Sequence, residues 1–445
     1  MESKIGGLSM HEGKNLKLSG LLNILAAAVA WLPTTSCKRS MTDPISSTKS
    51  QEDVSPVEAA WRRYFVDDLK LHYPYELQED CKPVFARANP AVPYVGTAIF
   101  FHGYTACPQQ FFEMRDYLTS LGFNVLIPLL PGQGRGPAQL KGDTVAERQH
   151  YYQYIPNIEK GGAQEYEAFV DAMNAIMQKA TGLRVVGGLS VGGALAYRSV
   201  FAAPGLYERA LILAPFLTLP PDNFWRPIEP VDSSGKARWN AFYTNAKLKL
   251  NNDIRKIVIA NKADLISSDK QEVRWGDQCY KRNTGGRAGI CDTNIRNIAA
   301  TVKFGEGATA LAAKQADSEA FKNSPTQIQS VAVEFDDGSD TRATKDTFRK
   351  IREPNKFKNS LCFYRGTPHS FLSRQDHPGN AMNWLPHFHD RARKFLVDGQ
   401  FFDTEGPSRE LVRDPSLVEG AVSTAFPSKE ANIGAEEYFD LCRQS

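Results

Sequence analysis

The chain has 445 residues, of which 42% are hydrophobic and 23% are charged, as is typical of folded globular proteins. This composition excludes a disordered chain and a polytopic membrane protein, and the length fits about two to three domains or one domain with a large insertion. The 53 basic and 50 acidic residues leave a formal charge of +3. Because no basic cluster stands out, nucleic acid is not an expected partner.

The first predicted element is an export signal. Lys14 and Lys17 precede a strongly apolar stretch at residues 21–32. As a helix this stretch would span about 18 Å, which is too short for a bilayer core of roughly 30 Å but typical of a signal peptide. The sequence P-T-T-S-C that ends at Cys37 resembles the cleavage site of a bacterial lipoprotein, which implies that Cys37 becomes the lipidated first residue.

We therefore expect an exported protein of the bacterial cell envelope, anchored in the membrane through Cys37. Residues 1–37 form the predicted signal peptide, and residues 38–56, rich in Ser and Thr, form a flexible tether. Secretion to the periplasm or the medium, and an uncleaved anchor, are the alternatives.

An even number of further cysteines in an exported protein indicates disulfides, and buried free thiols are the alternative. These cysteines are Cys81, Cys107, Cys279, Cys291, Cys362 and Cys442.

Beyond the tether, short apolar runs alternate with amphipathic patterns. A helix is expected over residues 56–73, and later helices over residues 109–121, 164–180, 191–202, 344–352 and 382–396. Continuous apolar runs between them are typical of strands buried on both faces. These runs lie at residues 97–101, 123–130, 183–187, 209–213, 330–335 and 360–364.

This alternation predicts an α/β fold with a mostly parallel sheet covered by helices on both faces. The rhythm is lost over residues 215–326, which we interpret as a large cap insertion at one end of the sheet. The core then comprises residues 57–214 and 327–398, and residues 399–445 form a polar C-terminal extension.

The most informative motif is Gly188-Leu189-Ser190-Val191-Gly192, which fits G-x-S-x-G. It lies between a predicted strand and a helix that begins with small residues. Such a turn exposes the serine oxygen at the carboxyl edge of the sheet. Because the turn is tight, the positions two residues before and after the serine require glycine. The helix behind it presents backbone N–H groups to a developing negative charge. Ser190 is therefore the candidate nucleophile.

Two further motifs follow predicted strands, His102-Gly103-Tyr104 and Pro131-Gly132-Gln133-Gly134. Together with the G-x-S-x-G motif, and in this chain order, they resemble the motifs of α/β-hydrolases of the carboxylesterase and monoacylglycerol-lipase-like kind. The resemblance covers residues 97–214 and 330–396. It implies an oxyanion hole formed by the N–H groups of Tyr104 and Val191, with a structural role for His102.

The resemblance also implies a triad in the chain order Ser, Asp, His. His369 follows the last predicted strand, where the family has its general base. For the acid, Asp340 follows Gly338-Ser339 and precedes an amphipathic helix, as in the family pattern. Asp337 is the alternative acid, because it lies at the more usual distance from the end of the strand.

These residues predict a serine esterase or lipase that cleaves carboxylic esters, including lipid or acylglycerol-like esters, through an acyl-enzyme on Ser190. Thioesterase, amidase or peptidase activity on the same triad is the alternative, as is a non-catalytic surface lipoprotein with this fold. No phosphate loop, dinucleotide fingerprint or metal-binding motif is found, so no cofactor or metal is expected. The expected partner is a small-molecule or lipid ester.

Overall fold

The structure is a computed structural model. It describes residues 54–135, 150–219, 241–262, 265, 272–274, 288–290, 292–333, 336, 338–352, 358–364, 369–372 and 384–402. The predicted signal peptide with Cys37, nearly all of the tether, and all but the first residues of the C-terminal extension lie outside this range.

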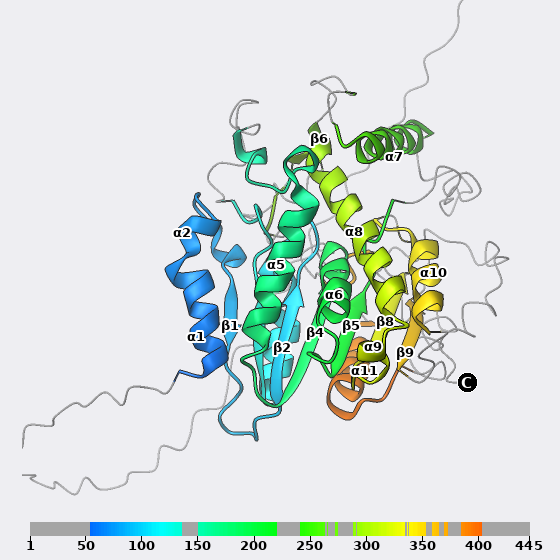
Figure 1. Ribbon diagram of the computed structural model, residues 1–445. Helices are drawn as coiled ribbons and strands as arrows, with labels where there is room; N and C mark the ends of the chain where they lie inside the picture. The colour runs from blue at the N-terminus through cyan, green and yellow to red at the C-terminus, as the bar shows by residue number, and fades with distance from the viewer. Residues whose placement is uncertain are drawn as a thin grey trace, which may run out of the picture. The chain divides into compact units, whose positions relative to one another are not determined.

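A seven-stranded sheet forms the centre of the fold (Figure 1). Its strand order is β1-β3-β2-β4-β5-β8-β9, and only β1 at the edge runs antiparallel to its neighbour. The predicted, mostly parallel sheet is thereby confirmed. The strands are Val84–Ala86, Gly96–Phe101, Phe123–Ile127, Leu183–Leu189, Arg209–Leu213, Gln327–Val333 and Asn359–Tyr364, in the order β1, β2, β3, β4, β5, β8 and β9.

Successive side chains of the central strands pack on opposite faces of the sheet, as the alternation of a strand requires. In β2, Ile99 and Phe101 belong to one apolar core, whereas Ala98 and Phe100 belong to the other. All six residues of β2 are buried. This double burial explains why the strand is a continuous apolar run in the sequence.

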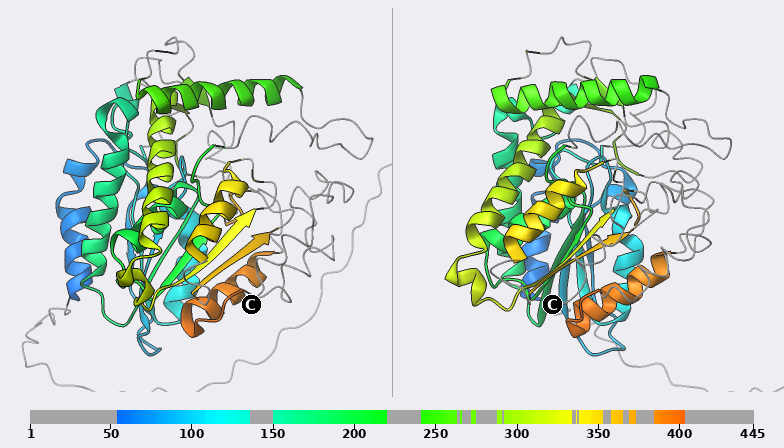
Figure 2. Two further views of the ribbon diagram at one scale, coloured as in Figure 1. Left: turned by 45° about the vertical axis from the view of Figure 1, so that its right-hand side comes forward. Right: turned by 90° about the vertical axis from the view of Figure 1, so that its right-hand side faces the viewer.

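Helices cover both faces (Figure 2). The larger core lies beneath α1, α5, α6 and α8, and the smaller core beneath α3 and α11. The helices α10 and α8 pack on the same side of the sheet. The bounds are Pro56–Arg62 (α1), Leu69–His72 (α2), Phe112–Ser120 (α3), Gly162–Met177 (α5), Val191–Ala202 (α6), Ala241–Ala260 (α7), Ile295–Gln315 (α8), Glu319–Lys322 (α9), Thr341–Arg352 (α10) and Trp384–Asp398 (α11).

The helix α8 lies within residues 215–326, for which the sequence indicates a cap. It packs against α5 and α6 in the main helical layer, and its side chains enter the larger core. At Gly305 an added Cβ would lie 2.6 Å from the carbonyl oxygen of Phe216, so glycine allows α8 to approach this backbone closely. The residues of the insertion thus contribute to the core as well as to the edge of the sheet.

Two short strands and four helical turns complete the described secondary structure. A two-stranded sheet pairs β6, Glu272–Arg274, with β7, Asp292–Asn294. Short helical turns lie at Arg63–Asp67 (η1), Glu79–Cys81 (η2), Pro108–Phe111 (η3) and Ile158–Lys160 (η5).

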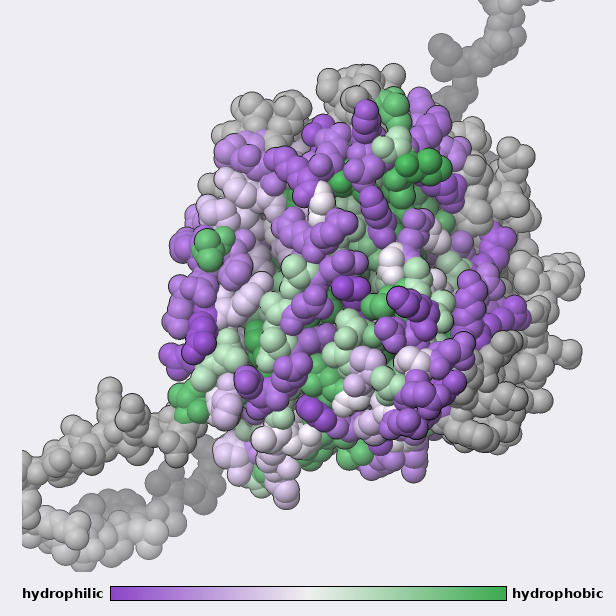
Figure 3. All heavy atoms as spheres, viewed as in Figure 1, coloured by the Kyte–Doolittle hydropathy of each residue, from purple (hydrophilic) through white to green (hydrophobic). Residues whose placement is uncertain are grey.

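On the face of the molecule seen in Figure 3, hydrophilic side chains cover most of the helices. Apolar side chains that are exposed singly among them are ordinary on a protein surface. Of the helices described, none is long and apolar enough to cross a membrane. Among the described residues, the exposed large apolar side chains are Val54, Val66, Leu71, Tyr94, Ile259 and Leu265.

Candidate active site

Three polar residues follow parallel strands at one edge of the sheet. Ser190 comes directly after β4, Asp336 three residues after the end of β8, and His369 five residues after the end of β9. The carboxyl ends of parallel strands meet at the same edge, which is where α/β sheets bind ligands. The strand order therefore brings together residues that are far apart in the sequence.

The turn at Ser190 confirms the predicted strand–turn–helix geometry. Ser190 has φ 60° and ψ −121°, so a residue that is not glycine adopts a positive φ. Such backbone conformations are strained and cluster at functional sites. A Cβ added at Gly192 would lie 1.9 Å from the carbonyl oxygen of Phe101, and one at Gly188 would lie 2.1 Å from that of Gly192. Both flanking glycines are therefore required by the close packing of backbone.

Backbone hydrogen bonds hold the strained turn in place. The Ser190 N–H donates to the carbonyl of Leu213 at 2.9 Å, which ties the turn to β5. The Ser190 carbonyl accepts from the N–H groups of Ala194 at 3.1 Å and Phe216 at 2.9 Å. The serine is therefore fixed by the start of α6 on one side and by the chain after β5 on the other.

His369 pairs with a buried carboxylate. Its Nδ1 lies 2.7 Å from Oδ1 and 2.8 Å from Oδ2 of Asp336, whose side chain is 1% exposed. Asp336 also accepts hydrogen bonds from the N–H groups of Gly338 at 2.7 Å and Ser339 at 2.9 Å, and from the Ser339 hydroxyl at 2.8 Å. These donors satisfy the buried carboxylate and fix its orientation toward the imidazole.

The acid expected from the sequence, Asp340, is corrected to Asp336 as the partner of His369. Asp340 precedes α10, and its Oδ1 accepts the N–H of Arg342 at 2.9 Å, which is the contact of an N-cap residue. Burial raises the pKa of Asp340, and hydrogen bonds from the backbone of Arg342 and Ala343 oppose this shift. The alternative acid, Asp337, lies outside the described residues.

A local signal for this outcome is present in the sequence. An aspartate just before an amphipathic helix is a typical N-cap, which describes Asp340. The residues Gly338 and Ser339 supply N–H groups to a carboxylate two and three positions earlier, which describes Asp336.

Residues 102–106, which we call the oxyanion loop because they contain the predicted oxyanion residue Tyr104, follow β2. His102 is fully buried, its Nε2 accepts the N–H of Leu130 at 3.0 Å, and its Nδ1 lies 2.9 Å from the Gly103 carbonyl. Burial lowers the pKa of His102 to about 3, so the ring is neutral and ties this loop to the chain after β3. The Gly103 N–H donates to Gln110 Oε1 at 2.7 Å. Tyr104 follows this fixed glycine, and Val191 begins α6 directly after Ser190.

The described residues include three cysteines, all of them buried. Within this part of the chain no group of three or more His, Cys, Asp or Glu side chains could hold a metal ion. Cys107 and Cys362 are buried free thiols, which is the alternative to disulfides for these two, and Cys81 is fully buried. The other candidates for pairing, Cys279, Cys291 and Cys442, lie outside the described residues.

The solved structures that resemble this chain are distant from it in sequence. No curated protein matches the sequence. One similar solved structure comes from work on two metagenome-derived lipolytic enzymes, LipS and LipT, with 15% identity, TM-score 0.46, and coverage of 73% of this chain and 100% of the other. A monoacylglycerol lipase from Paleococcus ferrophilus has 13% identity, TM-score 0.43, and coverage of 73% and 100%. A soluble variant of monoglyceride lipase from Saccharomyces cerevisiae has 14% identity, TM-score 0.44, and coverage of 71% and 91%.

A family model gives the more direct result. Residues 98–287 match the model described as the alpha/beta hydrolase family. The match includes Tyr104, Ser190 and Val191 and ends before Asp336 and His369. Together with the strand order and the strained turn at Ser190, it identifies this chain as a protein with the α/β-hydrolase fold.

Proposed function

We propose that this protein is a serine hydrolase that cleaves carboxylic esters through an acyl-enzyme on Ser190. One observation carries the proposal: a buried, fully hydrogen-bonded carboxylate, Asp336, holds Nδ1 of His369 at the sheet edge where Ser190 occupies a strained turn. A base oriented by a third group beside a nucleophile is the arrangement that activates a serine.

In the proposed first step, Ser190 Oγ attacks the acyl carbonyl carbon, and Nε2 of His369 accepts the serine proton. The contact of Nδ1 with Asp336 requires a proton on Nδ1 and leaves Nε2 free of one, which is the tautomer of a general base. Asp336 stabilises the imidazolium that forms. The N–H groups of Tyr104 and Val191 donate to the oxyanion of the tetrahedral intermediate.

In the second half of the reaction, the imidazolium returns its proton to the departing alkoxide, and the alcohol leaves. A water molecule then attacks the acyl-enzyme while His369 again accepts a proton. The second tetrahedral intermediate collapses, Ser190 regains its proton, and the carboxylic acid is released. No cofactor is needed for any of these steps.

Esters, including lipid and acylglycerol-like esters, are the proposed substrate class. Thioesters, amides and peptides react through the same intermediates, and they differ from esters mainly in the leaving group that His369 must protonate. Parallel assays with p-nitrophenyl esters, acyl thioesters and anilides of one acyl group would rank these activities. We expect the ester to have the highest kcat/KM, and a higher value for the anilide would contradict the proposal.

Labelling with a fluorophosphonate tests the nucleophile directly. Attack by Ser190 Oγ on phosphorus forms an O–P bond and releases fluoride, and only an activated serine reacts readily. We expect stoichiometric labelling that maps to Ser190 and is lost in Ser190→Ala. A folded wild-type protein that does not label would contradict the proposed function and favour a non-catalytic surface protein.

We also propose that Cys37 carries a lipid anchor in the cell envelope, with the catalytic domain tethered to the membrane. The proposal rests on the apolar stretch and the P-T-T-S-C sequence before Lys38. Each buried CH₂ of an acyl chain contributes about 0.8 kcal/mol, and stable anchoring needs more than one chain. Intact-mass analysis of the mature N-terminus is the test. An unmodified Cys37 would instead indicate secretion or an uncleaved anchor.

A further inference from the structure

The chain inserted after β5 returns to the oxyanion loop through residues 288–290. The N–H of Ile290 donates to the carbonyl of Thr105 at 3.0 Å. At Gly289, φ is +140°, and an added Cβ would lie 1.9 Å from the same carbonyl oxygen. The two backbones are therefore in direct contact, at a distance that a side chain at position 289 would prevent.

A side-chain contact follows three residues later. The hydroxyl oxygens of Tyr104 and Thr293 lie 2.6 Å apart, and Thr293, in β7, is fully buried. Burial raises the pKa of the Tyr104 hydroxyl, so this group remains protonated and can donate. Tyr104 is the residue whose N–H we assign to the oxyanion hole. A hydroxyl of the inserted chain thus holds the side chain of that residue.

The segment before Thr293 is itself held by the core. The Gln78 side chain forms two hydrogen bonds with Gly289, from Nε2 to the carbonyl at 2.8 Å and from the Gly289 N–H to Oε1 at 3.0 Å. The N–H of Ala288 donates to Oε1 of Gln109 at 2.8 Å. These amides attach the inserted segment to the core on both sides of the loop.

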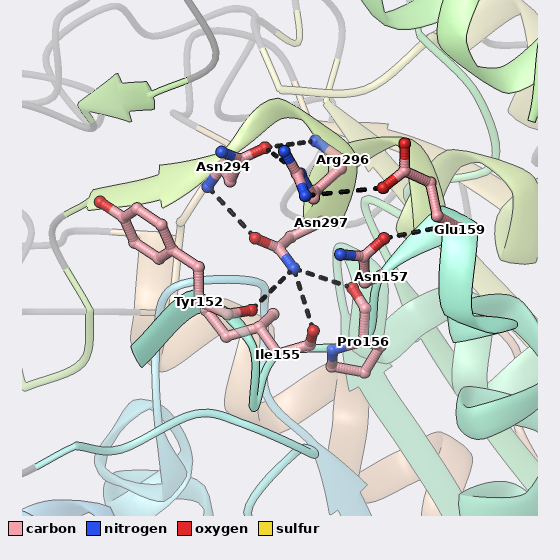
Figure 4. A network of polar contacts seen from close by, with 8 residues as sticks. All are labelled: Tyr152, Ile155, Pro156, Asn157, Glu159, Asn294, Arg296 and Asn297. Carbon is pink, nitrogen blue, oxygen red and sulfur yellow. Dashed lines mark hydrogen bonds and ion pairs between the residues drawn. The ribbon is translucent and has the colours of Figure 1, made fainter. Parts of the chain in front are cut away.

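The chain after Thr293 is held equally firmly (Figure 4). Asn294 caps α8, and its N–H lies 3.3 Å from Oδ1 of Asn297. The Asn297 amide points into the segment that precedes η5 and donates to three of its carbonyls. These belong to Tyr152 at 3.2 Å, Ile155 at 2.9 Å and Pro156 at 3.2 Å.

The oxyanion loop needs such support. Thr105 has φ 65°, a left-handed conformation that residues other than glycine adopt only where their surroundings enforce it. Gln110 and His102 hold the start of the loop from the core side. Its second half is contacted from the inserted chain, by Thr293 at Tyr104 and by Ile290 at Thr105.

We propose that Thr293 is a positioning residue for the oxyanion hole, which fixes the Tyr104 backbone through the Tyr104 hydroxyl. This inference rests on the proposed function and adds to it a role for the inserted chain. Because the N–H of Tyr104 acts on charge that develops only in the transition state, a displaced Tyr104 lowers kcat more than it changes KM.

The test compares Thr293→Val, which removes the hydroxyl and retains the shape, with Thr293→Ser, which retains the hydroxyl. Complete loss of an oxyanion donor costs about 10²–10³ in kcat, so a displaced donor should cost about tenfold. We expect Thr293→Val to lower kcat and the rate of fluorophosphonate labelling by this factor, with KM changed less than about twofold. Thr293→Ser should restore both rates.

Tyr104→Phe removes the same contact from the core side and should show the same loss. The double variant Tyr104→Phe/Thr293→Val should lose no more than either single variant, because the contact is already absent. If Thr293→Val does not fold, Tyr104→Phe provides the same comparison with the wild type. Additive losses in the double variant would contradict the proposed coupling.

Tyr207→Phe is the matched control. The Tyr207 hydroxyl donates to Oδ1 of Asn174 at 2.7 Å in a buried contact. Tyr207 precedes β5, so this contact lies at the amino ends of the strands, opposite the candidate site. Its loss should lower the melting temperature but leave kcat within about twofold. An unchanged kcat in Thr293→Val, or an equal loss in Tyr207→Phe, would overturn the inference. A wild-type protein that does not label would instead refute the proposed function.

Discussion

The turn that carries Ser190 and the loop that carries Asp336 are held in position by different means. At the turn, backbone packs on backbone: an added Cβ at Gly192 would meet the Phe101 carbonyl at 1.9 Å. In the loop, hydrogen bonds and a side chain define the geometry: an added Cβ at Gly338 would meet the His369 ring at 2.8 Å. The turn can be recognised from residue types alone, whereas the loop takes its role from a partner 33 residues away.

The difference shows which part of the site tolerates change. A backbone clash cannot be relieved without moving a strand or a helix, so the turn either forms or does not. In the loop the close contacts are with side chains, which can rotate to relieve a clash. The same difference predicts how substitutions on the two sides of the site should differ.

The largest expected effect is at the turn. Ser190→Ala should lower kcat for short p-nitrophenyl esters by about 10⁶, because the nucleophile is lost while the oxyanion site remains. The melting temperature should change little, because the backbone contacts of the turn do not involve the hydroxyl. Steady-state kinetics with circular dichroism would measure both, and activity retained within tenfold would refute the assignment of the nucleophile.

The next effect distinguishes two carboxylates of the loop. Asp336→Asn should lower kcat by about 10⁴, because an amide stabilises the wrong imidazole tautomer. Asp340→Asn is the matched control, since asparagine caps a helix about as well as aspartate, and its activity should stay within a few fold. If the two variants rank in the reverse order, Asp340 is the acid and the contact seen here is not the catalytic one.

A pair of glycine substitutions tests the difference between the turn at Ser190 and the loop at Asp336. Gly192→Ala should cost at least about 3 kcal/mol of folding free energy, because its clash is with backbone. Gly338→Ala should leave the protein folded and lower kcat by about ten- to a hundredfold, because its clash displaces His369. Denaturant titration and kinetics on both variants would separate the two outcomes. Equal effects on stability would show that the two regions do not differ as described.

A smaller effect should appear in the pH dependence of stability. Burial lowers the pKa of His102 from 6.5 to about 3, so between these values the unfolded chain binds a proton that the folded protein does not. Stability should therefore fall as the pH falls through this window, by about 1.4 kcal/mol per pH unit from this group, and level off below about pH 3. In His102→Gln this slope should decrease by about 1.4 kcal/mol per pH unit, which is the contribution of one proton.

The exposed His150 provides the control for that measurement. His150→Gln replaces the same residue type outside the core, and it should leave the slope of the wild type unchanged. Urea titrations at several pH values would compare the three proteins. A wild-type slope in His102→Gln would mean that another group causes the loss of stability in acid.

Much of the fold follows from the sequence, because strands buried on both faces are continuous apolar runs. The prediction for residues 209–213 matches β5 and that for residues 191–202 matches α6. The short edge strand β1 and the helix α8 were not predicted. The strand β1 has only three half-buried residues, so it lacks the continuous apolar run of the central strands. The buried side of α8 contains several alanines and the polar residues Asn297 and Thr301, which makes its apolar face less conspicuous in the sequence.

The candidate site was predictable to a different extent at each residue. Ser190 lies in a motif whose glycines are required sterically, and His369 lies five residues after the last strand. The acid was not predictable in the same way, because Asp336, Asp337 and Asp340 lie within five positions of one another. The N–H groups of Gly338 and Ser339 are a local signal for Asp336, but the contact with the imidazole of His369 is a tertiary property. The role of Thr293 depends on a contact across 189 residues and has no local signal.

The position of α8 has a consequence for how this protein could be re-engineered or could have diversified. Here an exchange of residues 215–326 would also remove Ala299, Ala300 and Ala312, which are fully buried in the larger core. The apolar side of α6 would then face water. A viable chimera must therefore retain α8 and join the foreign segment upstream of Ala288, so that the contacts of Ile290 and Thr293 with the oxyanion loop also remain.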